Sequence, residues 1–125
     1  MSKILVAEDD KFLANAYRVK LTKAGFEVTS VADGQEAMDA IRASAPDLIL
    51  LDLMMPVKDG FFVLDEIKKD EKLKKIPIIV ASNLGQKEDI EKAVQMGAKD
   101  FIIKSDVSLD VIIEKIKGEL SKTKG

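Results

Sequence analysis

The 125-residue sequence predicts a doubly wound α/β fold, in which a five-stranded parallel sheet carries helices on both faces. Five short apolar runs, rich in β-branched residues, alternate with five amphipathic stretches of helical spacing. The runs begin near positions 4, 27, 47, 76 and 99, so successive starts lie 20 to 29 residues apart. That spacing is about the length of a strand plus a crossover helix, which parallel neighbours require.

The apolar runs predict strands over residues 4–7, 27–31, 47–51, 76–81 and 100–103. Four of them are continuously apolar, as is typical of strands buried on both faces. The second run sets Val28 and Val31 among polar residues, so we expect it to form an edge of the sheet. We therefore expect the strand order 2-1-3-4-5, in which the first and third strands are neighbours.

The stretches between the strands predict helices, because their apolar residues recur at helical spacing. These residues are Leu13, Ala16, Tyr17, Leu21 and Ala24; Ala37, Met38 and Ile41; Val63, Leu64 and Ile67; Ile90, Ala93 and Val94; and Leu109, Ile112, Ile113, Ile116 and Leu120. We expect N-caps at Asp10, Asp33 and Ser108, and C-caps at Gly25 and Gly97.

The composition excludes several kinds of chemistry. The chain has 22 acidic and 20 basic side chains, a net charge of −2, and no histidine, cysteine or tryptophan. It can form no disulfide, thiolate nucleophile or imidazole base, so a bound metal must rest on oxygen ligands. Oxygen ligands favour hard cations such as magnesium or manganese. The charge balance provides no basic surface for nucleic acid.

The length and the N-terminus bear on organisation and location. A chain of this size forms one domain with one core. The first apolar run is interrupted by acids at Glu8, too early for a signal peptide or a membrane span. We therefore expect a cytoplasmic protein with no membrane segment.

Polar residues follow four of the five predicted strands, at the edge where open parallel sheets place their ligand crevice. These residues are Glu8, Asp9 and Asp10 after the first strand, Asp52 after the third, Ser82 after the fourth and Lys104 after the fifth. If the first and third strands are neighbours, Glu8, Asp9 and Asp52 share one pocket with a charge of −3. Lys104 supplies +1 and a divalent cation +2, so the sequence predicts a Mg²⁺ site. The alternative is an ordinary set of solvated turn residues and helix caps, which is the role that we expect of Asp10.

The residues at these strand ends resemble the receiver domain of two-component response regulators. The matching motifs are Ile4-Leu5-Val6-Ala7-Glu8-Asp9-Asp10, Asp47-Leu48-Ile49-Leu50-Leu51-Asp52-Leu53-Met54-Met55-Pro56 with Asp59-Gly60, Pro77-Ile78-Ile79-Val80-Ala81-Ser82, and Gly97-Ala98-Lys99-Asp100-Phe101-Ile102-Ile103-Lys104. The resemblance runs from Lys3 to about Leu120. It implies a flavodoxin-like receiver domain over residues 1–121 and a flexible tail at residues 122–125.

The resemblance also implies a role for each site residue. Asp52 would accept a phosphoryl group from a phosphohistidine of a histidine kinase or phosphotransfer protein. Glu8, Asp9, Asp52 and the backbone carbonyl of Met54 would hold Mg²⁺, with Mn²⁺ as a possible substitute. Ser82 and Lys104 would bind the phosphoryl oxygens.

Ser82 and Phe101 would form the conformational switch, although Phe101 also fits a plain core position. The domain would be a phosphorelay regulator rather than an enzyme, catalysing only its own phosphorylation and slow dephosphorylation. It would regulate an unidentified output partner, which we expect to bind the face formed by residues 86–120.

Three positions depart from the family pattern. Ser105 follows Lys104 where the family usually has a cis proline, so we expect a trans bond here, because a cis bond to a residue other than proline costs about 3 kcal/mol. Asn83 follows Ser82 where a small residue is usual, and its bulk would narrow access to Asp52. Met54 and Leu84 offer no polar group to orient a hydrolytic water, so we expect a long-lived aspartyl phosphate.

Two other functions remain open at this point. A degenerate receiver could act as a constitutive interaction module without phosphorylation. An aspartate-dependent phosphatase of the haloacid dehalogenase type also uses a strand-end aspartate, a hydroxyl, a lysine and Mg²⁺. It normally has a second acid two residues after the nucleophile, and this chain has Met54 there.

Overall fold

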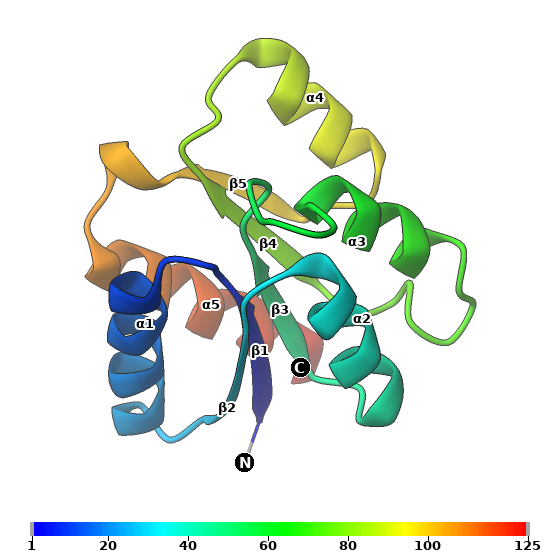
Figure 1. Cartoon of the computed structure of the whole chain (residues 1–125). Coiled ribbons are helices and arrows are strands. Elements are labelled where there is room, and N and C mark those ends of the chain that lie inside the picture. The colour runs from blue at the N-terminus through cyan, green and yellow to red at the C-terminus, as the bar shows by residue number, and fades with distance from the viewer. Residues whose placement is uncertain (1, 125) are drawn as a thin grey trace.

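A computed structural model describes the backbone of residues 2–124 and the side chains of residues 2–122. Its sheet is formed by five parallel strands, β1 (Lys3–Ala7), β2 (Glu27–Val31), β3 (Leu48–Leu51), β4 (Ile78–Ser82) and β5 (Asp100–Ile103) (Figure 1). The order is β2-β1-β3-β4-β5, which confirms the predicted fold class and the edge position of β2.

Three strands differ from their predicted ranges by one or two residues. β1 begins at Lys3 rather than Ile4, and β3 begins at Leu48 rather than Asp47. β4 begins at Ile78 rather than Ile76 and includes Ser82. The amide of Ile76 donates to the carbonyl of Leu73 at 3.0 Å, so this residue closes the preceding turn. Pro77 has no N–H to donate, and its carbonyl accepts from the Ile49 amide at 3.0 Å. Regular pairing therefore starts after the proline.

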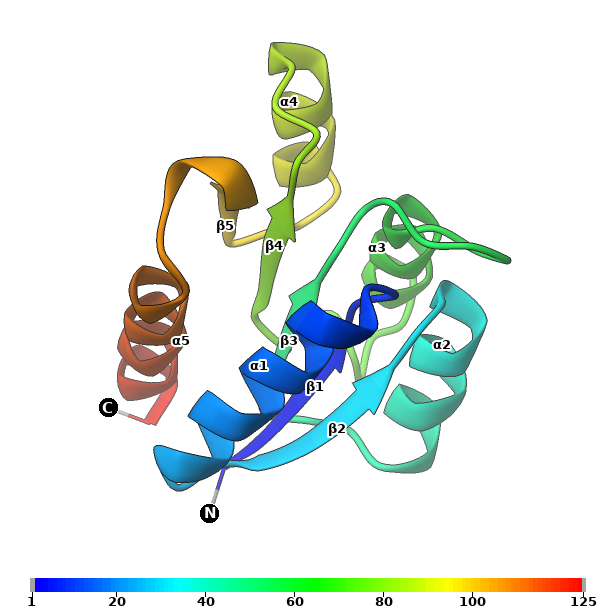
Figure 2. The same ribbon diagram turned by 60° about the vertical axis from the view of Figure 1, so that its left-hand side comes forward.

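The helices cover both faces of the sheet (Figures 1 and 2). They are α1 (Lys11–Lys23), α2 (Gly34–Ala43), α3 (Gly60–Lys68), α4 (Lys87–Gln95) and α5 (Leu109–Lys124), with a 3₁₀ turn, η1 (Lys104–Asp106), after β5. Helices α1 and α5 pack on one face, and α2, α3 and α4 pack on the other. Most of the apolar residues predicted for these helices supply the two buried layers, but Ala24 and Val94 are exposed.

The predicted N-caps are confirmed, whereas the predicted C-caps are one residue off, because the C-caps of α1 and α4 are Ala24 and Met96. Asp10 and Asp33 accept hydrogen bonds from amides three residues ahead, at 3.0 and 2.8 Å, and Ser108 does so at 3.4 Å. Gly25 and Gly97 follow α1 and α4 with φ of +97° and +105°. This left-handed conformation is one that glycine adopts at little cost, so both residues end their helices cleanly.

The C-terminal end of the chain bears on the predicted tail. Helix α5 extends to Lys124, so residues 122–124 continue the helix, and Gly125 lies outside the described residues. The flexibility of the segment 122–125 stays a prediction. Across the residues that the structure describes, every helix is too short or too polar to cross a bilayer.

The loop from β3 to α3 is tightly constrained next to Asp52. A Cβ atom at Gly60 would collide with the carbonyl oxygen of Asp52 and lie 2.7 Å from the Cα of Leu53. Only glycine lets α3 begin this close to the end of β3. Val57, in the same loop, has a φ of +66°, which is strained for a β-branched residue.

Replacing Val57 with asparagine is expected to raise the free energy of unfolding by about 1 kcal/mol, because asparagine tolerates the left-handed region better than valine. Little packing is lost, since Val57 is 75% exposed. Urea denaturation would measure the difference. Val94→Asn, at an exposed helical position, is the matched control, and a gain no larger than the control's would contradict the strain argument.

Candidate functional site

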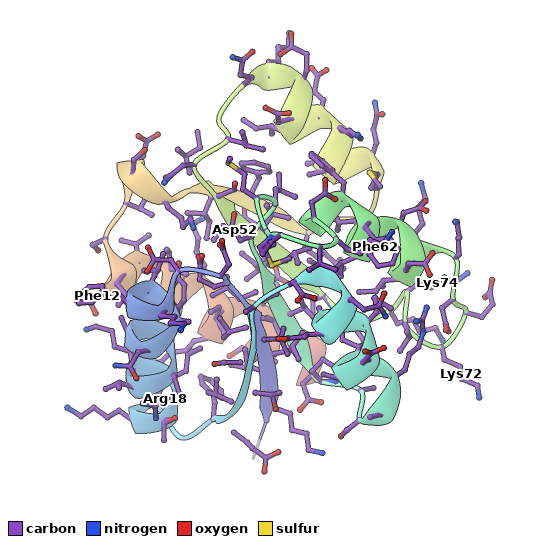
Figure 3. The ribbon with its side chains drawn as sticks, viewed as in Figure 1. Phe12, Arg18, Asp52, Phe62, Lys72 and Lys74 are labelled. Atoms are coloured by element: carbon purple, nitrogen blue, oxygen red, sulfur yellow. The ribbon has the colours of Figure 1, made fainter. Side chains whose placement is uncertain are left out.

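The carboxyl ends of β1 and β3 bring three carboxylates together. Ala7 pairs with Leu51 in the sheet, and the Asp52 amide donates to the Ala7 carbonyl at 3.0 Å, so Glu8 and Asp52 follow neighbouring strand ends. One carboxylate oxygen from each of Glu8, Asp9 and Asp52 lies within 4.8 Å of the other two, and we call these three residues the acidic cluster. Glu8 and Asp52 are buried, whereas Asp9 is exposed. Figure 3 places Asp52 at the ends of the central strands.

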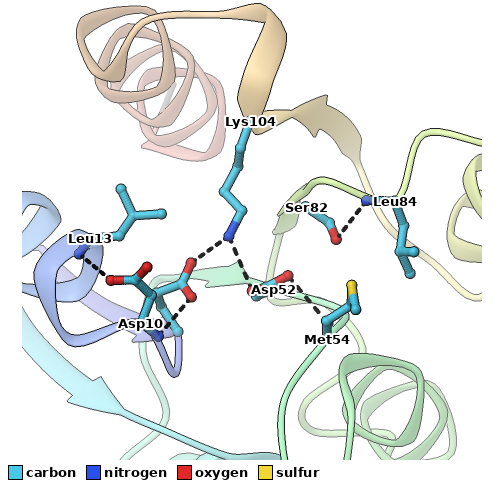
Figure 4. Close-up of polar contacts among 8 residues, drawn as sticks. Asp10, Leu13, Asp52, Met54, Ser82, Leu84 and Lys104 are labelled. Carbon is cyan, nitrogen blue, oxygen red and sulfur yellow. Dashed lines mark hydrogen bonds and ion pairs between the residues drawn. The ribbon is translucent and has the colours of Figure 1, made fainter.

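Lys104, the first residue of η1, reaches into this cluster from the end of β5 (Figure 4). Its Nζ lies 2.7 Å from Glu8 Oε1 and 3.1 Å from Asp52 Oδ2, and only 12% of its side chain is exposed. The charge of the cluster is therefore −3 + 1 = −2. Because Glu8 and Asp52 are buried, this excess charge needs further compensation, and one divalent cation would supply it.

Burial and hydrogen bonds shift the pKa values of Glu8 and Lys104. Removal from water raises the pKa of Glu8, although the hydrogen bonds from Lys104 and from the Asp10 amide, which lies 3.1 Å from Oε2, oppose the rise. Burial lowers the pKa of Lys104, but the Glu8 hydrogen bond and the two carboxylate charges outweigh it and raise that pKa. Lys104 is therefore cationic at neutral pH, whereas burial disfavours the charged form of Glu8.

Replacing Glu8 with glutamine in metal-free buffer is expected to stabilise the fold more at about pH 7.5 than at about pH 4.5. The pKa of Glu8 is higher in the folded chain than its ordinary value of 4.5, so the folded state binds the proton more tightly. The charged form therefore costs stability at neutral pH, and this cost disappears as the pH falls through the folded pKa toward the ordinary one.

Urea denaturation with EDTA at the two pH values measures this difference. Glu88→Gln, at an exposed position on α4, is the control and is expected to show no such pH dependence. An equal gain from Glu8→Gln at both pH values would contradict the burial argument.

The donor set fits a hard divalent cation. The acidic cluster provides only carboxylate oxygens, which Mg²⁺ and Mn²⁺ prefer. Asp9 borders an open pocket on each side of the cluster, of about 280 and 490 Å³, so a hydrated ion can reach it. The Met54 amide donates to Asp52 Oδ1 at 3.2 Å, which fixes the loop beside the cluster. The ligand role of the Met54 carbonyl stays a prediction.

The structure places the two predicted switch residues on adjacent strands. Ser82 is fully buried at the end of β4, and its Oγ accepts a hydrogen bond from the Leu84 amide at 3.3 Å. Phe101 pairs with Val80 in the sheet and is half-buried against the layer under α2, α3 and α4. Phe101 therefore serves the core in this conformation, and its movement with Ser82 stays a prediction.

The Lys104–Ser105 bond is trans, as expected, because the described residues contain no cis peptide bond. Asn83 is exposed beside the buried Ser82. That the bulk of Asn83 narrows access to Asp52 stays a prediction.

Tyr17 is the residue near the site that sequence reasoning missed. Its ring belongs to the apolar stripe of α1, as predicted, but its buried hydroxyl has no hydrogen-bond partner among the described residues. Burial raises the pKa of Tyr17, and the charges of Glu8 and Asp52 raise it further. In the sequence, the buried hydroxyl is indicated only by the presence of a tyrosine among the leucine and alanine residues of this stripe.

Several known proteins are similar to this chain in sequence and fold. Residues 4–117 match the model of the response regulator receiver domain. The chemotaxis protein CheY of Bacillus subtilis is 36% identical over 120 residues, which cover 95% of this chain and 98% of CheY. The DNA-binding dual master transcriptional regulator RpaA of a Synechocystis strain is 31% identical over 98% of this chain and 51% of RpaA. The phosphorylated cyanobacterial phytochrome response regulator RcpA has a TM-score of 0.82 and 38% identity, covering 94% of this chain and 89% of that one.

The parallel sheet and the acidic strand ends define a signalling domain of the two-component class. The chain belongs to the response regulator receiver domain family. Receiver domains are regulatory phosphoacceptors that bind a divalent metal through acidic residues, and the corresponding cluster of Glu8, Asp9 and Asp52 is present here. The chain spans between 39% and 51% of the length of several curated relatives named as transcriptional regulators.

Proposed function

We propose that this chain is a phosphorylation-dependent switch in which Asp52 accepts a phosphoryl group from a phosphohistidine. The observation that carries the proposal is the Asp52 carboxylate, held at a strand end between Lys104 and two further acids. The chain contains no histidine. The phosphohistidine therefore belongs to a partner, either a histidine kinase or a phosphotransfer protein.

In the transfer, a carboxylate oxygen of Asp52 attacks phosphorus, the phosphorus–nitrogen bond breaks, and the imidazole leaves with the electron pair. Lys104 already contacts Asp52 Oδ2 at 3.1 Å, so its charge lies where the phosphoryl oxygens arrive. Phosphoryl transfer depends on positioning and charge neutralisation, which a buried lysine at this point provides. The hydroxyl of Ser82 would bind another phosphoryl oxygen.

The proposed metal ligands are Glu8, Asp9, Asp52 and the backbone carbonyl of Met54. Bound Mg²⁺ or Mn²⁺ would neutralise the acidic cluster and the incoming phosphoryl group. Glu8 is held in place by Lys104 and by the Asp10 amide, whereas the exposed Asp9 stays open to solvent. The protein thus supplies both a fixed ligand and an accessible one.

Phosphorylation would act through Ser82 and Phe101 on the face formed by residues 86–120, which we propose as the surface for an output partner. Ser82 Oγ would exchange its contact with the Leu84 amide for the phosphoryl group. The domain would catalyse only its own phosphorylation and slow dephosphorylation. Met54 and Leu84 carry no polar side-chain atom to orient water, so the aspartyl phosphate would be long-lived.

Incubation with acetyl phosphate and Mg²⁺, followed by intact mass spectrometry, tests the proposal. We expect the chain to gain one phosphoryl group and Asp52→Asn to gain none, because the amide is not a nucleophile. Asp59→Asn is the matched control, since Asp59 caps α3 in the same loop and should not affect the gain. If the unmodified sequence gains no phosphoryl group, the chain acts as a constitutive interaction module instead.

A further inference from the structure

We propose that a pocket between the C-terminal ends of α3 and α4 binds a small aromatic carboxylate, whose charge is held by lysines at the mouth of the pocket. This α3–α4 pocket is lined by residues of α3, of the connection to β4, of β4 and of the turn after α4. Ile78 lines it and begins β4, whereas Ser82 ends that strand, so roughly 13 Å of strand separates the pocket from the edge that carries Asp52. Figure 3 shows Lys74, at the mouth, on the side of the molecule away from Asp52.

The interior of the α3–α4 pocket is apolar. Ile67 and Ile78 are buried, and Ile76 and Met96 are half-buried against the same apolar layer. The volume is about 280 Å³. An apolar cavity of about 150 Å³ holds benzene, so this pocket has room for two fused rings. An α-helix with its side chains is about 10 Å across, which is too wide for the pocket. The size therefore favours a small molecule over a helix of a partner protein.

The mouth of the α3–α4 pocket is positively charged. Lys68, Lys74 and Lys75 line it and are exposed, and none of the described residues that line it is acidic. The methylene stem of a lysine can extend an apolar wall while its ammonium group stays in water. A ligand with an apolar body and an anionic end therefore matches both the interior and the mouth.

The three ammonium groups are available to a bound anion. Lys68 Nζ donates to the carbonyl of Gln95 at 3.0 Å, a neutral partner that leaves two N–H donors. Lys74 Nζ lies 2.8 Å from Glu71 Oε2, but the Glu71 side chain is 85% exposed, so this surface ion pair contributes little and a ligand can replace it. Among the described residues, the Lys75 ammonium has no hydrogen bond or ion pair. The mouth can therefore donate several hydrogen bonds to one carboxylate.

Three probes test the interior and the mouth separately. 2-Naphthoate has two fused rings and a carboxylate, naphthalene-2-carboxamide keeps the rings without the charge, and acetate keeps the charge without the rings. A ligand of the size of 2-naphthoate with ordinary affinity per atom has a Kd of about 1 mM or below, which we expect here. In low-salt buffer we expect the carboxamide to bind at least about threefold more weakly, because it loses the attraction of the lysines. Acetate gains no apolar contact and is expected to bind at least about tenfold more weakly.

NMR spectra that correlate amide ¹H and ¹⁵N, recorded for the whole chain during each titration, measure the Kd and locate the ligand. The amides of residues 67–78 and 95–98 are expected to shift, whereas those of residues 8–10 and 52–54 keep their positions. Asp52→Asn is expected to bind 2-naphthoate with unchanged affinity, because Asp52 lies at the opposite edge of the sheet. Binding at this pocket is thus measured independently of phosphorylation.

A pair of double variants tests the role of the lysines. Lys74→Gln combined with Lys75→Gln removes two charges from the mouth, and we expect it to weaken 2-naphthoate about fivefold and to leave the carboxamide unchanged. Lys69→Gln combined with Lys72→Gln is the matched control, because it removes the same charge from exposed neighbours outside the pocket lining. We expect the control to change the affinity less than twofold. Circular dichroism checks that both variants are folded.

The inference is supported if 2-naphthoate binds more tightly than both other probes and shifts the pocket amides. It is wrong if 2-naphthoate does not bind, if the carboxamide binds equally well, or if the shifts fall elsewhere. It is also wrong if the control double variant loses as much affinity as the variant at the mouth. None of these results depends on phosphorylation of Asp52, so a failure here and a failure of the proposed function are distinguishable.

Discussion

Replacing Lys104 with methionine is expected to lower the free energy of unfolding by about 3 kcal/mol at neutral pH in metal-free buffer. The substitution keeps a side chain of similar length but removes the positive charge from a buried cluster. Glu8 and Asp52 are 3% and 7% exposed in their side chains, and both contact Lys104. Without it, their charges lie close together with little access to water. Urea denaturation with EDTA measures the loss.

Two comparisons isolate the electrostatic part of this effect. Lys115→Met breaks an exposed ion pair, because the side chains of Lys115 and Asp100 are 43% and 38% exposed. We expect it to lower the free energy of unfolding by less than about 1 kcal/mol. In a Glu8→Gln background, Lys104→Met should cost less than it does alone, because one of the opposing charges is already absent. A loss no larger than that of Lys115→Met would show that Lys104 does not balance the cluster.

Replacing Asp52 with asparagine is expected to raise the melting temperature in EDTA, with a gain in the free energy of unfolding on the order of 1 kcal/mol. The substitution takes the cluster from a charge of −2 to −1 while keeping an oxygen that can accept the Met54 amide. It loses one contact of Lys104, but the Glu8 contact at 2.7 Å remains. Relief of repulsion between buried like charges therefore outweighs the lost ion pair.

Addition of Mg²⁺ should narrow or reverse this difference. An ion that binds only the folded chain stabilises it more as its affinity rises, and Asp52→Asn removes one of the proposed ligands. Differential scanning fluorimetry with EDTA and with Mg²⁺ measures both changes. Asp59→Asn keeps a side-chain oxygen that can cap α3, so it should change stability little and keep the full response to Mg²⁺. A melting temperature of Asp52→Asn in EDTA no higher than that of the unmodified sequence would contradict the crowding argument.

The fold was predictable because its signals are local and repeated. Each buried strand is a continuous apolar run, the runs recur at crossover spacing, and the mixed run containing Val28 and Val31 is the edge strand β2. The approach of Glu8 and Asp52 followed from one topological rule, that parallel strands end at the same edge. Helix caps such as Asp33 were equally predictable, because a capping side chain acts within three residues.

Other features depend on three-dimensional contacts that leave no periodic signal. The left-handed conformation of Val57 arises from the tight β3–α3 loop and opposes the preference of valine. The unpaired hydroxyl of Tyr17 depends on what surrounds the end of its ring. One pocket is lined by residues from several segments, among them Met54 in the loop after β3 and Leu84 in the loop after β4. From the sequence, we predicted only that Met54 and Leu84 carry no polar group to orient a hydrolytic water.

The ion pair between Glu8 and Lys104 joins residues 96 positions apart, whereas Lys104 and Asp52 are 52 positions apart. Closing loops of this length costs conformational entropy, so these contacts are stable only when the strands that carry the residues have docked. An incompletely folded or truncated chain therefore carries Asp52 without its cationic partner. The proposed phosphoryl transfer to Asp52 would then require that β1, β3 and β5 have all docked, so the proposed signal would depend on a completely folded domain.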